Sequence, residues 1–211
     1  MKAAHEAVPE MQFSITFLGG AAPLTVEELR PFEPYLGVYT FHDNKFLRNA
    51  GYHDYIEELL RKGKTVTHYT CSTRMTEDLD REFRQNAWMG ERWGLKGNGI
   101  YHGIDAQGGA GATNWKTAMY GGLIYRAGDR YVPSVRGMAL RQGVQDVKYL
   151  AVLRRIAGGS GEVDSFLREA AVRVTDNPAG GDRGMPDRMR EKAAELILKF
   201  SSGNNAGKAT R

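Results

Sequence analysis

The chain has 211 residues, of which 41% are hydrophobic and 26% charged, as in an ordinary globular protein. Its formal net charge of +4 comes from basic and acidic residues that are interleaved, which argues against a nucleic-acid-binding arm. A single cysteine excludes an internal disulfide framework, and no apolar stretch approaches the ~18 residues of a membrane-spanning helix. We therefore expect neither nucleic acid nor a membrane as a partner.

Four apolar runs are predicted to be strands, at residues 12–17, 36–40, 65–69 and 99–104. The first alternates apolar and polar side chains with the period of two that a strand requires. The third is rich in β-branched and aromatic residues, which favour strands. Strand starts recur every 24 to 34 residues with a helix in each interval, which favours β/α units and a parallel sheet over hairpins.

The intervals between these strands carry helix signals. Thr25 and Glu28 have the spacing of a capping box, so a short helix should begin there. Apolar residues recur at helical spacing over residues 52–60, before Gly63 supplies a left-handed stop. A third helix is expected to begin at Thr76, because acidic residues follow it directly.

The remainder of the chain is predicted to be a loop followed by helices. Residues 105–128 form a long glycine-rich loop, and a helix follows within residues 133–153. Two further amphipathic helices are expected near residues 163–174 and 187–200. Residues 201–211 have the composition of a disordered tail.

Several segments have distinctive sequence motifs: HYTCS at 68–72, FRQNAWMGERWGLKGNGIYHGID at 83–105, the pair Asn114 and Trp115, LIYRAG at 123–128, and PSVRGMALRQGVQDVKYLAVL at 133–153. In these segments the chain resembles the C-terminal part of the glycoside hydrolase family 123 catalytic domain, also known as domain of unknown function 4091. The resemblance covers most of residues 10–157.

Four positions depart from the family pattern. Met138 stands where the family has Glu, Gln142 where it has Asp, Gln145 where it has Glu, and His102 where it has an aromatic residue, commonly Trp. Three carboxylates are thus replaced by neutral side chains. This motivates a second hypothesis, in which the chain is a non-catalytic carbohydrate-binding or structural barrel remnant.

The resemblance implies an α/β fold: a partial (β/α)8 TIM barrel of about strands five to eight with their helices, plus C-terminal helices. Residues 1–157 would be the C-terminal half of the barrel, residues 158–200 an appended helical segment, and residues 201–211 a disordered tail. Half a barrel leaves two open sheet edges, and open edges favour pairing with another chain. We therefore expect an edge-to-edge homodimer.

The family resemblance also implies hydrolysis of terminal N-acetylhexosaminides, characteristically N-acetylgalactosamine, without any cofactor. The acetamido group of the substrate is the nucleophile, and an adjacent Asp-Glu pair supplies the carboxyl groups. No Asp-Glu dipeptide occurs in this chain. Counting the four strands as five to eight places the pair upstream of Met1, so we expect a fragment or truncated product that is inactive alone. The chain carries no signal peptide, and the intact protein could be secreted or periplasmic.

In a barrel of this kind the active site lies at the carboxyl ends of the strands. Sugar recognition requires aromatic faces and planar polar groups, and such side chains follow the predicted strands. The candidates for substrate binding are His42, Tyr69, His102, Asp105, Asn114 and Trp115. The alternatives are that Tyr69 packs inside the barrel and that Trp115 only anchors a loop.

Two other groups of polar residues have competing explanations. Histidines 42, 68 and 102 and Cys71 lie on or just after strands, which suggests zinc, but no pair has ligand spacing. We therefore predict no metal site. A metal-dependent enzyme is the third hypothesis, after the glycoside hydrolase and the non-catalytic barrel remnant. Arg136, Arg141 and Asp146 are expected to hold their helix in place through ion pairs, the alternative being that Arg136 faces the active site.

Overall fold

A computed structural model describes most of the chain, in two compact units that are considered separately. It describes residues 2–9, 13–17, 23–71, 78–100, 122–127 and 129–206. The sheet unit comprises Met1–Ser72 and Gly94–Tyr101, and the helical unit comprises Thr73–Trp93 and His102–Arg211.

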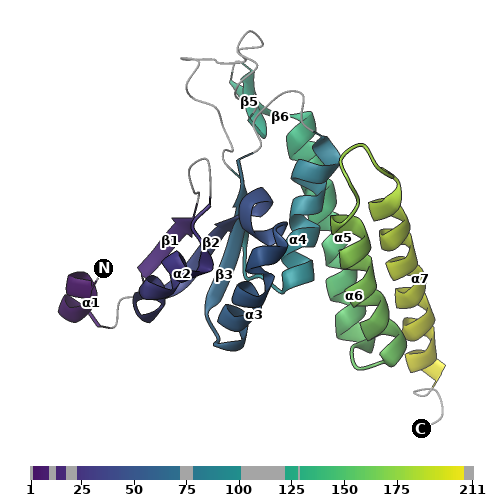
Figure 1. Cartoon of the computed structure of the whole chain (residues 1–211). Helices are drawn as coiled ribbons and strands as arrows, with labels where there is room; N and C mark the ends of the chain where they lie inside the picture. The colour runs from purple at the N-terminus through teal and green to yellow at the C-terminus, as the bar shows by residue number, and fades with distance from the viewer. Residues whose placement is uncertain are drawn as a thin grey trace. The chain divides into compact units, whose positions relative to one another are not determined.

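The sheet unit is built on four parallel strands (Figure 1). They are β1 (Phe13–Phe17), β2 (Leu36–His42), β3 (Thr65–Thr70) and β4 (Asn98–Ile100), and they lie in the sheet in that order. All four predicted strands are therefore present, although the predicted end of the fourth, residues 101–104, lies outside the described residues. The α/β class is confirmed, whereas the barrel, its division at residue 157 and the edge-to-edge dimer stay predictions.

The helices of the sheet unit follow from local signals. Thr25 caps α2 (Val26–Leu29): its hydroxyl accepts from the N–H of Glu28 at 3.3 Å, and the Glu28 carboxylate accepts from the N–H of Thr25 at 2.7 Å. The predicted capping box is thus confirmed. Gly63, at φ 73°, follows the end of α3 (His53–Arg61) as expected. The bounds are α1 (Lys2–Ala7), α2 (Val26–Leu29), a 3-10 helix (Arg30–Tyr35), a π-helical turn η2 (Asp43–Leu47), a 3-10 turn (Ala50–Tyr52) and α3 (His53–Arg61).

The two faces of this sheet differ in polarity. Residues paired in register on neighbouring strands share a face, and successive residues alternate between faces. One face, the apolar face, carries buried side chains: Phe17, Tyr39, Phe41, Val66 and His68. Helix α3 contributes its own buried side chains to the unit's core. The opposite, polar face carries Ser14, Thr16, Thr40, His42, Thr67 and Tyr69, and the hydroxyls of Thr40 and Thr67 hydrogen-bond at 2.8 Å.

The helical unit packs four helices around one core (Figure 1). They are α4 (Gln85–Trp93), preceded by a π-helical segment η4 (Asp80–Arg84), then α5 (Val135–Ala157), α6 (Gly161–Thr175) and α7 (Met185–Ala206). Trp88 on α4 is fully buried among leucine, valine and alanine side chains of the other three helices. Helix α7 continues to Ala206, so residues 201–206 are helical and not part of the disordered tail expected from the sequence. Residues 207–211 lie outside the described residues.

A hairpin stands where the sequence predicted only a loop. Strands β5 (Ile124–Ala127) and β6 (Arg130–Pro133) pair antiparallel. The dipeptide between them, Gly128-Asp129, is of the kind that favours a tight hairpin turn. The turn dipeptide was not recognised because it follows a glycine-rich run that was predicted to be a loop.

Within the described ranges, no helix combines the length and the apolar character needed to cross a bilayer.

Candidate functional site

The carboxyl ends of β2 and β3 bring together two of the six side chains predicted to bind sugar. His42 ends β2 and is paired in register with Tyr69 on β3, so both lie on the polar face. Their ring centroids are 5.1 Å apart and the rings meet edge to face at 78°. His42 is buried, whereas Tyr69 is half-buried. The pair therefore places an aromatic ring and an imidazole side by side at the strand ends.

The other four candidates cannot be placed relative to this pair. His102, Asp105, Asn114 and Trp115 lie outside the described residues. Their proposed contacts with sugar stay predictions, as does the role of His42 and Tyr69.

Tyr69 and Cys71 are both protonated at neutral pH. Burial raises the pKa of Tyr69 to about 12; at the high pH where Tyr69 titrates, the negative charge of the Cys71 thiolate and a hydrogen bond to Cys71 add to this effect. Burial also raises the pKa of Cys71, although the hydrogen bond to Tyr69 and the charge of Lys45 partly oppose it. A thiol with a raised pKa is a poor nucleophile. The site can therefore offer hydrogen bonds and an aromatic ring, but not an activated thiolate or phenolate.

Asp43 directly follows β2 and is the one carboxylate that directly follows a strand of the four-stranded sheet in the part of the chain that the structure describes. Its side chain is buried and lies 3.7 Å from Nε of Arg48. Glycosidases need carboxyl groups acting together, either as a pair of side chains or with the substrate's own acetamido group. The described carboxyl ends of the sheet strands thus contain no carboxylate pair, and the carboxylate of Asp43 is paired with the guanidinium group of Arg48.

His68 lies on the apolar face, where it is 1% exposed. Neither ring nitrogen has a hydrogen-bond partner among the described residues. Burial lowers the pKa of His68 to about 4, and the charge of Arg48 adds to this effect. The residue is therefore a neutral core histidine, without a hydrogen bond to any of the described residues.

The pKa of His68 predicts a loss of stability in acid. Unfolded His68 binds a proton near pH 6.5 and folded His68 only near pH 4, so stability is complete above pH 6.5 and is lost as the pH falls toward 4. We expect His68 to reduce the free energy of unfolding by about 2 kcal/mol between pH 8 and pH 5. Urea denaturation at several pH values would measure this. The variant His68→Leu should lose this dependence of the unfolding free energy on pH, whereas His53→Gln should retain it. An unchanged pH dependence in His68→Leu would refute the assignment.

The zinc hypothesis gains no support from the described residues. His42 and His68 sit on neighbouring strands but on opposite faces of the sheet, so they cannot share a metal ion. Across the described ranges no three side chains of histidine, cysteine, aspartate or glutamate are grouped as metal ligands. His102 lies outside these ranges.

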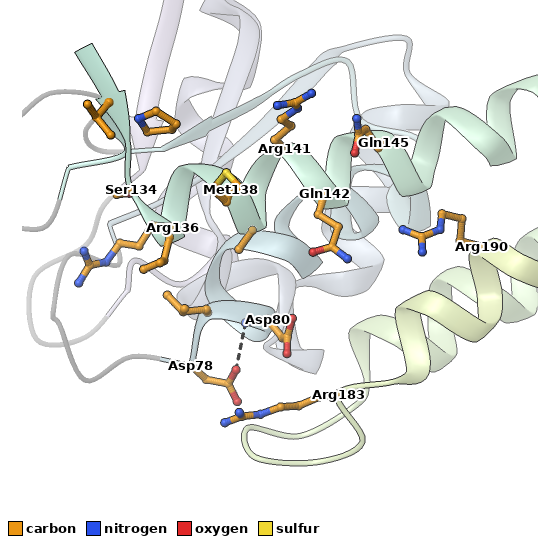
Figure 2. Close-up of a pocket in the computed structure, with 15 residues that line it drawn as sticks. Asp78, Asp80, Ser134, Arg136, Met138, Arg141, Gln142, Gln145, Arg183 and Arg190 are labelled. Carbon is orange, nitrogen blue, oxygen red and sulfur yellow. Dashed lines mark hydrogen bonds between the residues drawn. The ribbon is translucent and has the colours of Figure 1, made fainter. Parts of the chain in front are cut away.

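A pocket on α5, in the helical unit, was missed from the sequence. The three positions where family carboxylates are replaced, Met138, Gln142 and Gln145, all line one pocket of about 1090 Å³ (Figure 2). Their spacing of four and three residues places them on one side of a helix. This spacing could have predicted that they lie together, but the sequence does not show which elements face them.

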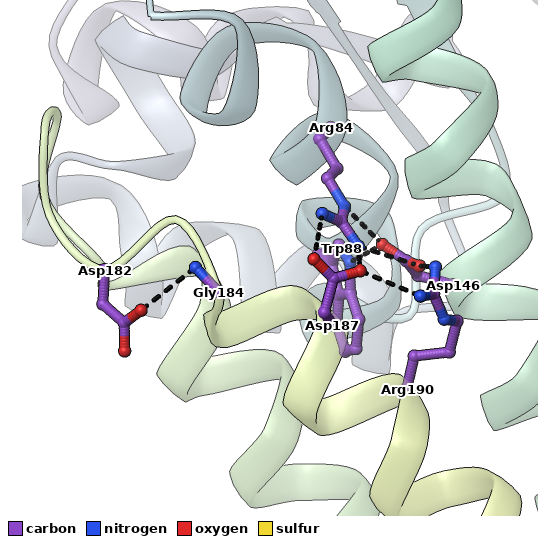
Figure 3. Close-up of polar contacts among 7 residues, drawn as sticks. All are labelled: Arg84, Trp88, Asp146, Asp182, Gly184, Asp187 and Arg190. Atoms are coloured by element: carbon purple, nitrogen blue, oxygen red, sulfur yellow. Dashed lines mark hydrogen bonds and ion pairs between the residues drawn. The ribbon is translucent and has the colours of Figure 1, made fainter.

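Asp146 organises the polar contacts between η4, α4, α5 and α7 (Figure 3). Its carboxylate accepts from Arg84 at 2.7 and 3.2 Å, from Arg190 at 3.0 Å and from the indole N–H of Trp88 at 3.3 Å. Asp187 accepts from Arg84 at 2.7 Å and from Arg190 at 2.9 Å. Burial opposes the charge of Arg84, but hydrogen bonds to Asp187 and Asp146 outweigh it and raise its pKa.

Of the ion pairs expected of α5, those of Asp146 are confirmed. Arg141 makes no ion pair with any residue that the structure describes, and instead it lines the pocket. Arg136 also lines the pocket and is 5% exposed. The partners of Asp146 are 58 and 62 residues earlier in the chain for Trp88 and Arg84, and 44 residues later for Arg190.

The sequence matches no protein-family model and none of the curated proteins. Its fold, in contrast, is similar to a solved structure of a family 123 glycoside hydrolase from Clostridium perfringens, a protein studied for glycolipid glycan hydrolysis. The TM-score is 0.58 at 13% sequence identity, and the likeness covers 99% of this chain and 40% of that one. The chain thus spans about two fifths of the length of that enzyme and, across nearly all of its own length, has a fold like that of a family 123 glycoside hydrolase.

Proposed function

We propose that this chain is part of a glycoside hydrolase of the family 123 type that acts on terminal N-acetylhexosaminides, with N-acetylgalactosamine as the characteristic sugar. The observation that carries the proposal is the fold likeness over 99% of the chain to a family 123 enzyme studied for glycolipid glycan hydrolysis. The family pattern in residues 133–153 independently suggests the same family.

In this proposal the described strand ends bind sugar and do not perform the acid–base chemistry. The half-buried ring of Tyr69 would pack against the C–H face of the sugar, and its neutral hydroxyl would donate to a sugar oxygen. His42, at the adjacent strand end, would provide a second polar contact. The acetamido group of the substrate would act as nucleophile, with the Asp-Glu pair placed upstream of this chain.

Titration with N-acetylgalactosamine, followed by NMR, tests this assignment. We expect weak, saturable binding by the wild-type chain and binding at least about tenfold weaker in Tyr69→Ala, because the variant loses the apolar surface that the ring would bury against the sugar, and a loss of about 1.4 kcal/mol is tenfold in affinity. Tyr131→Ala is the matched control, since Tyr131 is 64% exposed on β6 in the other unit. Equal affinities of Tyr69→Ala and the wild type for N-acetylgalactosamine would show that Tyr69 does not bind the sugar.

A second candidate is a non-catalytic carbohydrate-binding or structural barrel remnant. It is favoured by one observation: the three positions at which family carboxylates are replaced by neutral side chains, Met138, Gln142 and Gln145, line the same pocket. An Asp-Glu pair after a strand in the upstream reading frame would count strongly against this candidate.

A further inference from the structure

Helix α5 carries a line of exposed cations. Arg141, Lys148 and Arg155 all lie on this helix and are all exposed. They follow one another at intervals of seven residues, and seven residues make almost two full helical turns, so the three side chains share one side of the helix. These three residues, here called the basic stripe, therefore extend along about 21 Å of helix.

The basic stripe has no counter-charge in the part of the chain that the structure describes. None of its three side chains makes a hydrogen bond or an ion pair with a described residue. Figure 2 shows that Arg141 lies on the side of α5 away from Asp78 and Asp80. The stripe is thus a line of positive charge that these contacts leave available to a ligand.

The other charged residues of α5 do not neutralise the stripe. Asp146 is the one acidic residue in the sequence of α5, and it is fully buried and bound to Arg84 and Arg190. Arg154 is paired with Glu91. The exposed side of α5 therefore carries cations and no acidic residue of its own.

The side chains beside the stripe suit a carbohydrate. Gln145 and Tyr149 lie one helical turn apart, both are exposed, and neither makes a hydrogen bond with a described residue. An amide both donates and accepts hydrogen bonds, as sugar hydroxyl groups do, and a tyrosine offers an aromatic face next to a hydroxyl. Val144 and Val152 are half-buried, so no bulky apolar side chain projects between the cations.

The spacing of the cations distinguishes between classes of polyanion. Neighbouring cations of the stripe are about 10.5 Å apart along the helix axis, whereas duplex DNA carries a charge about every 1.7 Å of its axis. Segments that bind anionic membranes are clusters of about 4–8 Lys and Arg, not a line of three. A polysaccharide with one acidic sugar in each disaccharide repeats its charge over two sugar rings, a length comparable to the distance between neighbouring cations.

We propose that the basic stripe of α5 binds a linear anionic polysaccharide that carries about one charge per disaccharide. Successive acidic groups pair with Arg141, Lys148 and Arg155, while Gln145 and Tyr149 contact the sugar rings between them. This surface is separate from the proposed sugar site and uses none of its residues, so either can fail without the other.

Fluorescence anisotropy of labelled oligosaccharides, with the full chain at low ionic strength, tests the proposal. Hyaluronan octasaccharide, which has one carboxylate per disaccharide, should bind with saturation and at least about tenfold more tightly than neutral chitohexaose. The tetrasaccharide of hyaluronan has two carboxylates for three cations and should bind at least about threefold more weakly than the octasaccharide. Excess N-acetylgalactosamine, which occupies the proposed sugar site, should not change this binding, and added salt should weaken it.

The triple variant Arg141→Gln/Lys148→Gln/Arg155→Gln tests the stripe itself. We expect it to bind the octasaccharide about tenfold more weakly, because exposed ion pairs contribute little one at a time and three are lost together. Glutamine favours helix about as well as arginine and lysine, so the variant should keep the circular dichroism spectrum of the wild type.

Arg61→Gln/Lys96→Gln/Arg168→Gln is the matched control, since it removes the same charge from exposed positions on three different elements or loops. It should bind the octasaccharide as the wild type does. Equal losses in the two triple variants, or equal binding of chitohexaose and hyaluronan octasaccharide, would overturn the proposal. So would a stripe variant that loses more affinity for duplex DNA or phosphatidylserine vesicles than for hyaluronan.

Discussion

Replacing Asp146 by alanine is expected to lower the free energy of unfolding of the helical unit by about 3 kcal/mol, because removing one partner of a buried ion pair leaves the other charge only partly compensated. Asp146 is fully buried and Arg84 is 3% exposed. Asp187 would still accept from Arg84, but the Nε–H of Arg84 and the indole N–H of Trp88 would lose their acceptor. Urea denaturation followed by circular dichroism measures the change.

Glu162→Ala provides the comparison for Asp146→Ala. Glu162 pairs with Lys199 at 2.7 Å, but both side chains are more than half exposed. Exposed pairs contribute little, so this variant should lose less than about 1 kcal/mol. If both variants lost the same amount, Asp146 would not hold the helices together.

Gly143→Ala is expected to cost about 3 kcal/mol, at the upper end of what overpacking usually costs. Gly143 lies on α5 where the helix touches the backbone of Arg84. A Cβ atom there would be 2.9 Å from the carbonyl carbon of Arg84 and closer still to its oxygen, so the backbone of η4 or α5 would have to move. Thermal denaturation should show a clear decrease in Tm.

The control for this variant is Gly161→Ala at the beginning of α6. A Cβ atom at Gly161 meets nothing within 4 Å. Alanine favours helix over glycine, so this variant should be neutral or slightly stabilising. A Gly143→Ala protein as stable as Gly161→Ala would show that α5 and η4 can separate without cost.

The sequence predicted the elements that depend on local signals. Apolar runs, with strand periodicity in the first and β-branched residues in the third, located β1 to β3 and the start of β4, and Thr25 with Glu28 predicted the capping box. Helices α5, α6 and α7 followed from amphipathic spacing. The hairpin of β5 and β6 was missed because its turn signal lay within a glycine-rich run.

Features that depend on distant residues could not be derived in this way. The spacing of Met138, Gln142 and Gln145 indicates one helix face, but only the folded chain places Asp80 and Arg183 opposite them. Likewise, the register of β2 with β3 decides that His42 meets Tyr69 while His68 faces the other side. A one-residue change in register would exchange the two faces.

In the proposed function, the described strand ends bind an N-acetylhexosaminide without cleaving it. Incubation of the chain with 4-nitrophenyl N-acetylgalactosaminide, in both anomers, tests this in one sample: NMR follows the ring signals of His42 and Tyr69 while absorbance follows 4-nitrophenolate. We predict that the ring signals shift with saturation and that no 4-nitrophenolate is released. Release of 4-nitrophenolate by the chain, or ring signals that do not respond to either anomer, would contradict the claim.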